Sequence, residues 1–308
     1  MKIDALTRLY GIIGNPLSHT FSPAMHNAGF AARGINAVYL AFPLQNLTHL
    51  KYSMRQWSIQ GLSVTIPYKI SIRRLLDRID PLALQIGSVN TLRWGKDDAL
   101  EGYNTDGPGA IMALKKEKIA LKGKKVLVIG SGGSARSIGF ALAQEKPAQI
   151  GIMARNALMA MQLARNLRLN GETSNVTVHT RDASQQPLKS RAKLKPQGNT
   201  TWPTDPDVLA TYNLIINTTP MGMKGSESAG LSPLALHELH RHQTVFDIVY
   251  NPAQTPLLKH AKKRGCGIVL GYKMLLYQGV LQFELFTGKE APVREMEQAL
   301  LAQIRKVS

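Results

Sequence analysis

Apolar and polar residues alternate along the first third of the chain in a pattern that predicts a mixture of strands and helices. Short apolar runs predict strands at residues 9–13, 38–42, 62–66 and 89–94, and the apolar spacing from Ser22 to Arg33 predicts a helix. An alternation of strands and helices is typical of an α/β domain.

A second α/β pattern begins at Val126. The four apolar residues from Val126 to Ile129 predict a buried strand, which is followed by a glycine-rich loop and a helix. Further apolar runs predict later strands at residues 150–153, 176–179, 214–216, 245–249 and 268–270. Such strands predict a mostly parallel sheet that is buried on both faces.

Two segments fall outside this alternation. The stretch from Ser184 to Asp207 is polar and contains four prolines, so it predicts an irregular surface excursion. Helical periodicity returns at residues 274–286 and 292–304, with Gly288 as the break between the two helices. We therefore expect two domains, residues 1–106 and 107–273, with C-terminal helices of about 274–308 that pack back on the first domain.

Composition narrows the class of protein. The 308 residues are 44% hydrophobic, enough to bury a sizeable core, and no apolar run approaches the roughly 20 residues that span a bilayer. Residues 1–4 lack an apolar signal region. Cys266 is the only cysteine, which excludes an intrachain disulfide and a thiolate metal cluster, and no other metal site is expected. These features predict a cytoplasmic protein with no membrane partner.

The net charge of +18 predicts affinity for anions. Nucleic acid is one such anion, but the basic residues are dispersed in small groups without a recognition motif. Aromatic residues make up 6% of the chain and do not alternate with the basic groups, as they would on a base-stacking surface. The sequence therefore argues against a nucleic-acid partner.

The segment from Gly130 to Arg136 directly follows the apolar strand and opens a helix. Glycines let the backbone approach a pyrophosphate, and the amide groups and dipole at the helix start stabilise its negative charge. The pattern therefore favours a dinucleotide site in a Rossmann-type doubly wound sheet over a tight turn in a nucleotide-free protein. The candidate cofactor-binding residues of this loop are Gly130, Ser131, Gly132, Gly133, Ser134 and Ala135.

The next strand ends at Met153-Ala154-Arg155-Asn156. An NAD-specific site usually places an acidic residue here, on the ribose hydroxyls, and this chain has none. Arg155 can instead bind a 2′-phosphate. We therefore favour a role for Arg155 in binding NADP over the alternative that it is an ordinary exposed arginine at a strand end. NAD is kept as the second cofactor candidate.

Lys69 lies just beyond the strand predicted at residues 62–66. Val64 and Ile66 are expected to be buried, so that Lys69 then lies at the mouth of whatever cleft the strand end borders. A lysine there can contact a substrate. The alternative is a solvated lysine that opens a helix from Tyr68 to Leu76.

Two polar turns add further candidates. Asp106, in the turn from Gly102 to Gly107, is a candidate partner for Lys69, although Asn, Thr and Asp are also ordinary turn residues. The turn from Gly14 to Pro23 contains several hydroxyl groups, and Ser22 could either bind a ligand or cap the helix that follows.

The combination of these motifs resembles shikimate dehydrogenase and the related quinate/shikimate dehydrogenases. The resemblance runs from about Tyr10 to Leu300. The motifs arrive in order as Asn15-Pro16 to Asn27, Ser63 to Lys69, Ser88 to Thr91, Asn104 to Asp106, the glycine loop, Ile216 to Met223, Asp247 to Leu258 and Gly271 to Gln278. This resemblance favours a catalytic Lys69 over a solvated one.

The resemblance implies an NADP-dependent oxidoreductase that reversibly reduces 3-dehydroshikimate to shikimate, in chorismate and aromatic amino acid biosynthesis. The first domain would bind the substrate and the second the cofactor, with a cleft between them. Lys69 would be the catalytic proton-transfer group, with Asp106 beside it as its catalytic partner. The implied substrate-binding residues are Thr20, Ser22, Thr65, Lys69, Asn90, Asp106, Tyr250 and Gln278. Beyond the glycine loop, the implied cofactor-binding residues are Arg155, Asn156, Thr218, Met221 and Gly271.

The chain departs from the common family pattern at a few positions. Thr20 stands where serine is commonest, and its extra methyl group, worth about 1–3 kcal/mol in a pocket, bears on the preference between shikimate and quinate. Ala154 and Met159 replace the Asn and Arg often found around the cofactor phosphate.

Two alternative functions remain beside the leading one. One is a quinate/shikimate dehydrogenase that uses NAD or NADP. The more distant one is a non-enzymatic nucleotide- or nucleic-acid-binding protein on the same fold, because a fold alone does not imply activity. For the assembly we expect a monomer or a homodimer.

Overall fold

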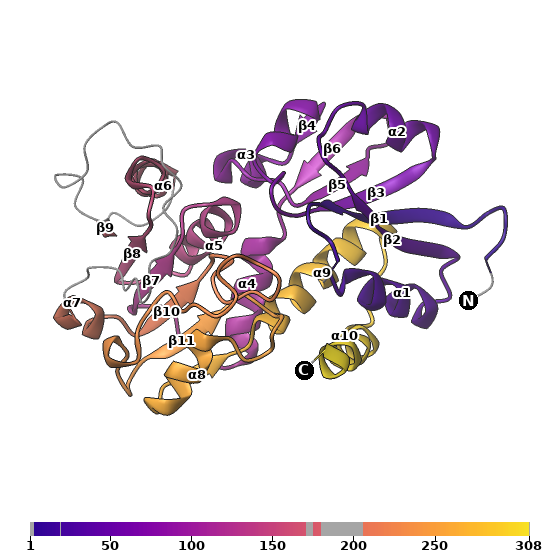
Figure 1. The fold of residues 1–308 in the computed structure, drawn as a ribbon. Helices are drawn as coiled ribbons and strands as arrows, with labels where there is room; N and C mark the ends of the chain where they lie inside the picture. Colours follow the sequence, from indigo (N-terminus) through magenta and orange to yellow (C-terminus); the bar gives the residue numbers. More distant parts are fainter. Residues whose placement is uncertain (1–2, 19, 171–174, 180–205, 308) are drawn as a thin grey trace. The chain divides into compact units, whose positions relative to one another are not determined.

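The computed structural model describes residues 3–18, 20–170, 175–179 and 206–307. The chain divides into two units (Figure 1). The first consists of Met1–Ala113, Arg136–Ile138 and Tyr272–Ser308, and the second of Leu114–Ala135 and Gly139–Gly271. The irregular excursion predicted from Ser184 to Asp207 lies outside the described residues, except that Pro206 and Asp207 begin a short helix.

A mixed sheet forms the centre of the first unit. Its spatial order is β2-β1-β3-β5-β6-β4. β1 runs parallel to β2 and β3, whereas β5 is antiparallel to both β3 and β6. The strands are β1 (Arg8–Gly14), β2 (Ala37–Pro43), β3 (Ile59–Val64), β4 (Arg78–Ile79), β5 (Thr91–Trp94) and β6 (Leu100–Tyr103).

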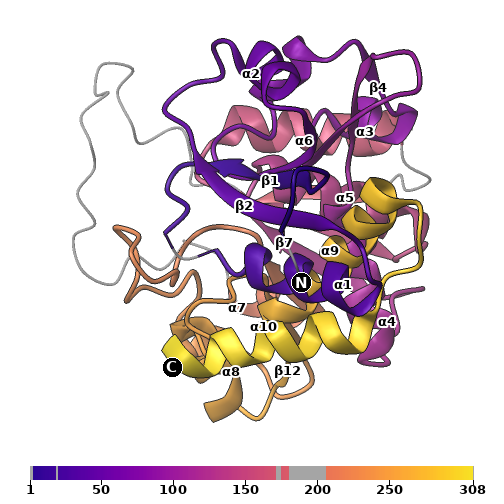
Figure 2. The same ribbon diagram turned by 90° about the vertical axis from the view of Figure 1, so that its right-hand side faces the viewer.

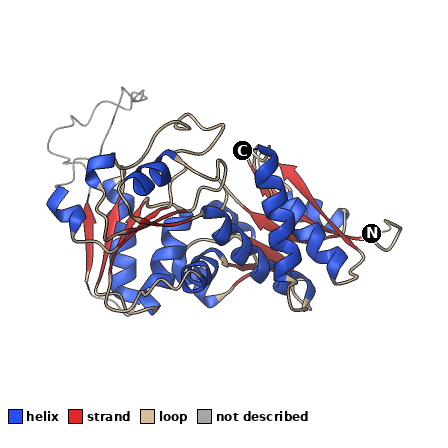
Figure 3. Ribbon diagram, turned by 90° about the horizontal axis from the view of Figure 1, so that it is seen from below, coloured by secondary structure: helices blue, strands red, loops and turns tan. Residues whose placement is uncertain are grey.

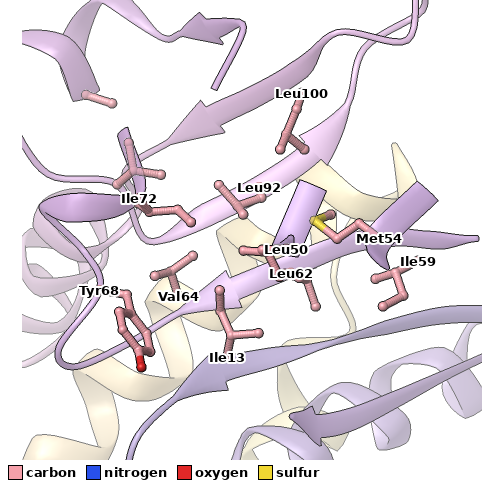
Figure 4. Close-up of a cluster of buried hydrophobic side chains, with 12 residues drawn as sticks. Ile13, Leu50, Met54, Ile59, Leu62, Val64, Tyr68, Ile72, Leu92 and Leu100 are labelled. Carbon is pink, nitrogen blue, oxygen red and sulfur yellow. The ribbon is translucent and has the colours of Figure 1, made fainter. Parts of the chain in front are cut away.

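Helices cover both faces of this sheet. Ile13, Leu62 and Leu92 face an apolar cluster that Leu50 and Met54 of α2 complete (Figure 4). The opposite face is covered by α1 and α9, with α10 packed along α1 (Figure 2). The helical segments are α1 (Ser22–Ala32), α2 (Leu50–Gln56), the 3₁₀ helix η1 (Ser71–Leu75), α3 (Pro81–Ile86), α9 (Gly271–Thr287) and α10 (Val293–Val307).

The end of β3 differs from the sequence prediction. The strand ends at Val64, and Ile66 is 52% exposed, so the prediction that Ile66 is buried is wrong. The chain leaves the sheet before Pro67, and the Ile66 carbonyl accepts a hydrogen bond from Asn15 N–H at 2.9 Å. Ile66 and Pro67 are therefore exposed, whereas Tyr68, directly before Lys69, is buried in the apolar cluster.

The helix considered from Tyr68 to Leu76 is reduced to the short 3₁₀ helix η1. The reason lies at Lys69, whose carbonyl accepts a hydrogen bond from Val89 N–H at 2.8 Å and is not used to close a helical turn. The backbone of Lys69 is thus fixed to the segment that leads into β5.

The second unit contains a fully parallel sheet. Its order, β12-β11-β10-β7-β8-β9, is the doubly wound order of a Rossmann fold, which confirms the predicted fold class. Four central strands are almost wholly buried, as predicted, and helices lie around them (Figure 3). The strands are β7 (Lys125–Ile129), β8 (Gln149–Met153), β9 (Val176–His179), β10 (Leu214–Asn217), β11 (Thr244–Asp247) and β12 (Gly267–Val269).

The remaining helices follow the strands of the second unit, apart from α4, which begins in the first unit and ends in the second. They are α4 (Asp106–Lys116), α5 (Gly133–Gln144), α6 (Ala157–Asn170), α7 (Pro206–Ala210), the 3₁₀ helix η3 (Leu236–Glu238) and α8 (Pro256–Lys263). None of the helices in the described ranges is long and apolar enough to cross a membrane.

Candidate active site

A buried ion pair lies beyond the carboxyl end of β3. Lys69 Nζ donates to Asp106 Oδ2 at 2.5 Å, and only 13% and 4% of the two side chains are exposed. Asp106 occupies the first turn of α4, where the helix dipole favours negative charge. The structure thus brings together the two residues that the sequence analysis paired.

Asn90 holds the carboxylate of Asp106 from the other side. Its Nδ2 donates to Asp106 Oδ1 and to Thr105 Oγ1, both at 2.9 Å. Its Oδ1 accepts from Thr105 N–H at 2.8 Å. Because both oxygens of Asp106 accept hydrogen bonds, the carboxylate is fixed in one orientation.

Gln278, on α9, contacts the side-chain amide of Asn90. Asn90 Nδ2 lies 3.4 Å from Gln278 Oε1, and Gln278 Nε2 donates to the Leu275 carbonyl at 2.9 Å. Helix α4 touches α9 at Gly109, where an added Cβ would lie 2.5 Å from the backbone nitrogen of Gln278. Only glycine permits this contact, which holds Asp106 and Gln278 close together.

Three further hydroxyl groups lie at the same edge of the sheet. Ser22 does not cap α1, because the N-cap residue is Phe21, and instead Thr20 Oγ1 donates to Ser22 Oγ at 3.3 Å. Thr65 follows β3, and its N–H donates to the Ile13 carbonyl at 2.9 Å. Since β1 and β3 are parallel neighbours, the loops that carry Thr20 and Thr65 leave the sheet at one edge.

The glycine loop lies at the switch point of the parallel sheet, between β7 and α5. Gly130 has a φ of 122°, and an added Cβ there would lie 2.3 Å from Thr218 Oγ1. Gly132 is the N-cap of α5, and an added Cβ there would meet no atom within 4 Å. An open backbone at a helix start without acidic residues fits a phosphate group of a dinucleotide.

The other predicted residues of the glycine loop lie next to Gly132 in the chain. Ser131 is buried, and Gly133, Ser134 and Ala135 form the first turn of α5. Thr218 donates from both its N–H and its hydroxyl to the Ile129 carbonyl, at 2.9 and 2.6 Å, which ties the end of β10 to the start of the loop.

Arg155 and Asn156 follow β8 and are both exposed. Asn156 Oδ1 accepts from Met159 N–H at 3.0 Å, so this side chain caps α6. The arginine therefore stands at the carboxyl edge of the sheet, where the predicted 2′-phosphate contact requires it.

Three more of the predicted binding residues belong to the second unit, namely Met221, Tyr250 and Gly271. The Met221 carbonyl lies 3.5 Å from Asn217 Nδ2. Gly271 packs so closely on the end of β11 that an added Cβ would lie 2.3 Å from the Val249 carbonyl oxygen. Tyr250 is half-buried and follows β11, whereas the other predicted substrate-binding residues lie in the first unit.

Asp247 is a buried carboxyl group that the sequence analysis did not single out. Thr255 Oγ1 donates to its Oδ2 at 2.6 Å, and Asn217 Nδ2 and Val249 N–H donate to its Oδ1 at 2.9 and 3.1 Å. Burial outweighs these hydrogen bonds and raises the pKa of Asp247 to about 7.

This raised pKa predicts a pH-dependent stability. The folded protein keeps a proton that the unfolded chain releases, so the free energy of unfolding should fall as the pH rises from about 4 to about 7 and then level off. Urea unfolding of the wild type and Asp247→Asn measures this effect. We expect the wild-type value minus the variant value to fall by about 1 kcal/mol or more from pH 5 to pH 8. A constant difference would contradict the assignment.

Three buried polar residues behind Asn90 were missed by sequence reasoning. They are Ser63, Thr91 and Gln282. The sequence did contain a signal for Gln282. It follows Gln278 by four residues on the same helix, and residues four apart lie on the same face of a helix. Ser63 and Thr91 belong to quoted motifs, but no local pattern distinguishes a hydroxyl that orders the site from an ordinary strand residue.

A Rossmann-type sheet with a glycine loop at a helix start, joined in one chain to an α/β unit with a buried Lys–Asp pair, defines a two-domain α/β protein of the dehydrogenase type. Residues 12–92 match the profile of the shikimate dehydrogenase substrate binding domain, and residues 271–301 match that of the shikimate 5′-dehydrogenase C-terminal domain. The chain is 39% identical over 300 residues to a shikimate dehydrogenase (NADP⁺) of Methanobrevibacter smithii, which covers 97% of this chain and 98% of the relative. The chain belongs to the shikimate dehydrogenase family.

Solved structures agree with this assignment. A crystal structure of shikimate dehydrogenase in complex with NADP⁺ superposes with a TM-score of 0.82 at 34% identity, covering 100% of this chain and 98% of that one. The shikimate 5-dehydrogenase of Listeria monocytogenes, in complex with shikimate and NAD, gives a TM-score of 0.81 at 30% identity, with coverages of 97% and 98%.

Proposed function

We propose that this chain is an NADP-dependent shikimate dehydrogenase that reversibly reduces 3-dehydroshikimate to shikimate. The observation that carries the proposal is the buried Lys69–Asp106 pair, with Nζ and Oδ2 2.5 Å apart, at the end of β3 in a chain of this family. The reaction adds a hydride to a ketone carbon and a proton to its oxygen, so it needs a proton donor held beside the oxygen.

Lys69 is the proposed proton donor. As an ammonium group it can polarise the ketone oxygen and pass a proton to it during reduction, and as an amine it can remove that proton in the reverse direction. Asp106 keeps Nζ in place, and Asn90 keeps Asp106 in place. Thr20, Ser22, Thr65, Asn90, Tyr250 and Gln278 are proposed to bind the carboxylate and hydroxyl groups of the substrate.

The cofactor proposal rests on the second unit. Bound NADPH would supply the hydride. The open backbone at Gly132 and the start of α5 would hold its pyrophosphate, and Arg155 would pair with the 2′-phosphate. The neighbouring Ala154 is buried and contributes no side-chain hydrogen bond, so Arg155 would carry much of the selectivity for NADP over NAD.

This role of Arg155 gives a direct prediction. Arg155→Ala should raise KM for NADP about tenfold, because a charge-assisted contact to the 2′-phosphate is lost, and should change KM for NAD less than twofold. Steady-state kinetics with each cofactor measures both values. Arg165→Ala, at an exposed arginine farther along α6, is the matched control and should leave both values unchanged. An equal rise in KM for both cofactors would contradict the assignment.

One set of assays tests the proposed function. Initial rates with shikimate and with quinate, each against NADP and NAD, should give the highest kcat/KM for shikimate with NADP. A higher kcat/KM for quinate would favour the quinate/shikimate dehydrogenase alternative, for which the extra methyl group of Thr20 is the relevant feature. Absence of turnover in all four combinations would overturn the proposal.

The proposal also covers location and assembly. We propose that the enzyme works in the cytoplasm, as a monomer or homodimer, on small-molecule ligands alone. The single cysteine in 308 residues is compatible with a reducing compartment.

A further inference from the structure

A continuous chain of hydrogen bonds runs through the interior of the first unit toward Asp106. It begins at the Tyr39 hydroxyl, which donates to Ser63 Oγ at 2.6 Å, and Ser63 donates in turn to Gln282 Oε1 at 2.7 Å. Gln282 Nε2 donates to Thr91 Oγ1 at 3.0 Å, and Thr91 donates to Asn90 Oδ1 at 2.8 Å. These residues come from β2, β3, β5 and α9, so the chain joins four elements of the unit.

Each hydroxyl in this chain has one proton, and that proton is already committed. Ser63 accepts from Tyr39, so its own proton goes to Gln282. The amide of Gln282 is therefore oriented with Oε1 toward Ser63 and Nε2 toward Thr91. Because Thr91 accepts from Gln282, its proton is left for Asn90.

The orientation of Asn90 decides what faces the carboxylate. With Oδ1 toward Thr91 and the Thr105 N–H, Nδ2 faces Asp106 Oδ1 at 2.9 Å. A flipped amide would place a carbonyl oxygen against the carboxylate, and the two would repel each other. The group that orients Asn90 therefore also affects the position of Lys69, through Asp106.

We infer that Gln282 is a positioning residue that, together with the Thr105 N–H, fixes the amide orientation of Asn90 and, through it, the Asp106–Lys69 pair. Gln282 is 2% exposed, and its amide is satisfied at both ends, since Nε2 also donates to the Asn90 carbonyl at 3.1 Å. The consequence for catalysis rests on the proposed dehydrogenase function. The consequence for the orientation of Asn90 does not.

The decisive variant is Gln282→Glu, which keeps the shape of the side chain and loses its N–H donors. A carboxylate at this position accepts a hydrogen bond from Thr91 and so withdraws the proton that Asn90 Oδ1 receives from Thr91, which leaves Oδ1 with the hydrogen bonds from Thr105. We expect kcat for shikimate oxidation to fall about 30-fold. Gln282→Met, which neither donates nor accepts, leaves Thr91 free to donate to Asn90 and should lower kcat less than tenfold.

Thr91→Val provides a double-mutant cycle. It removes the hydroxyl through which Gln282 acts, so adding Gln282→Glu to this background should lower kcat less than threefold further. The matched control is Gln243→Met. Gln243 is an equally buried glutamine whose Nε2 donates to the Leu209 and Tyr212 carbonyls in the second unit. It should lower the melting temperature and leave kcat within twofold of the wild type.

A second measurement does not depend on turnover. Hydrogen exchange of the Asn90 side-chain amide, followed by NMR in the ligand-free full-length protein and assigned with Asn90→Asp, reports whether Nδ2 is held. We expect exchange at least tenfold faster in Gln282→Glu and unchanged in Gln243→Met.

The outcomes separate this inference from the proposed function. An active wild type with kcat in Gln282→Glu within twofold would overturn the inference, and so would a full 30-fold loss on the Thr91→Val background. A wild type without dehydrogenase activity would overturn the proposed function. In that case, unchanged exchange in Gln282→Glu would still overturn the orienting role of Gln282, and faster exchange would support it.

Discussion

Lys69→Ala should lower kcat for shikimate oxidation about 100-fold or more, while KM changes much less. The variant removes the ammonium group that lies 2.5 Å from Asp106 Oδ2 and that would exchange a proton with the substrate oxygen. Proton transfer by a positioned side chain typically contributes between about 10²- and 10⁴-fold to a rate. Steady-state kinetics with saturating NADP measures the loss.

Lys51→Ala is a suitable control for this variant. Lys51 pairs with Asp77 at the same distance, 2.5 Å, but the two side chains are 38% and 39% exposed. Exposed pairs contribute about 0–1 kcal/mol to stability, so this control should keep its rate and nearly all of its stability. Lys69→Ala leaves the buried carboxylate of Asp106 without its cation, so folding must be checked by circular dichroism. Lys69→Met, which keeps most of the apolar stem, serves as a second variant, and a folded variant at the wild-type rate would rule out the assigned role.

Gly132→Asp should raise KM for NADP about 100-fold and leave the fold intact. Position 132 is the N-cap of α5 and has φ and ψ of −78° and −167°, where aspartate is among the favoured residues. An added Cβ at position 132 meets no atom within 4 Å, so we expect the packing around it to be undisturbed. Its carboxylate would compete with the cofactor for the same backbone N–H groups and would repel the pyrophosphate.

Calorimetric titration with NADP and thermal unfolding together test this expectation. The matched control is Gly230→Asp, since an added Cβ at Gly230 also meets no atom within 4 Å. The two variants carry the same charge change on the second unit, so a general effect of net charge would appear in both. Unchanged NADP affinity in Gly132→Asp would place the pyrophosphate elsewhere.

The second unit was the easier part to predict from sequence. Its four central strands are largely apolar and almost wholly buried, and a strand buried on both faces has an unambiguous pattern. The edge strand β9 also has the predicted bounds, although only its first residue, Val176, is buried. The elements missed in the first unit, among them β4 and α3, have two and six residues. β4 forms because β6 pairs with it, and its own two residues contain little signal. α3 did carry a signal that was overlooked, since Asp80 caps its start, Pro81 is its first residue and Gly87 ends it in the left-handed conformation.

The candidate site likewise contains some features that the sequence could predict and others that it could not. Lys69 and Asp106 lie in motifs, so the resemblance could pair them, and the structure places them in contact. Ile66 was misjudged because an apolar residue before Pro67 resembles a strand residue, whereas the chain has already left the sheet. The side chain of Asn90 is linked through Thr91 to Gln282, which is 192 residues away from Asn90. Hydrogen bonds between residues so far apart in the sequence form only in the folded chain, so no local sequence pattern predicts them. The catalytic and binding roles themselves stay predictions until the variants are assayed.

The contact between α4 and α9 at Gly109 has a consequence for redesigning this enzyme. Asp106 and Gln278 stand on two helices that touch backbone to backbone, so a substitution that shifts either helix would move both residues. Thr20, by contrast, stands on a loop beyond β1 and bonds mainly to its neighbour Ser22. Directed evolution toward a different ring acid should therefore succeed sooner with a library at residues 14–21 than with one at the helix contact.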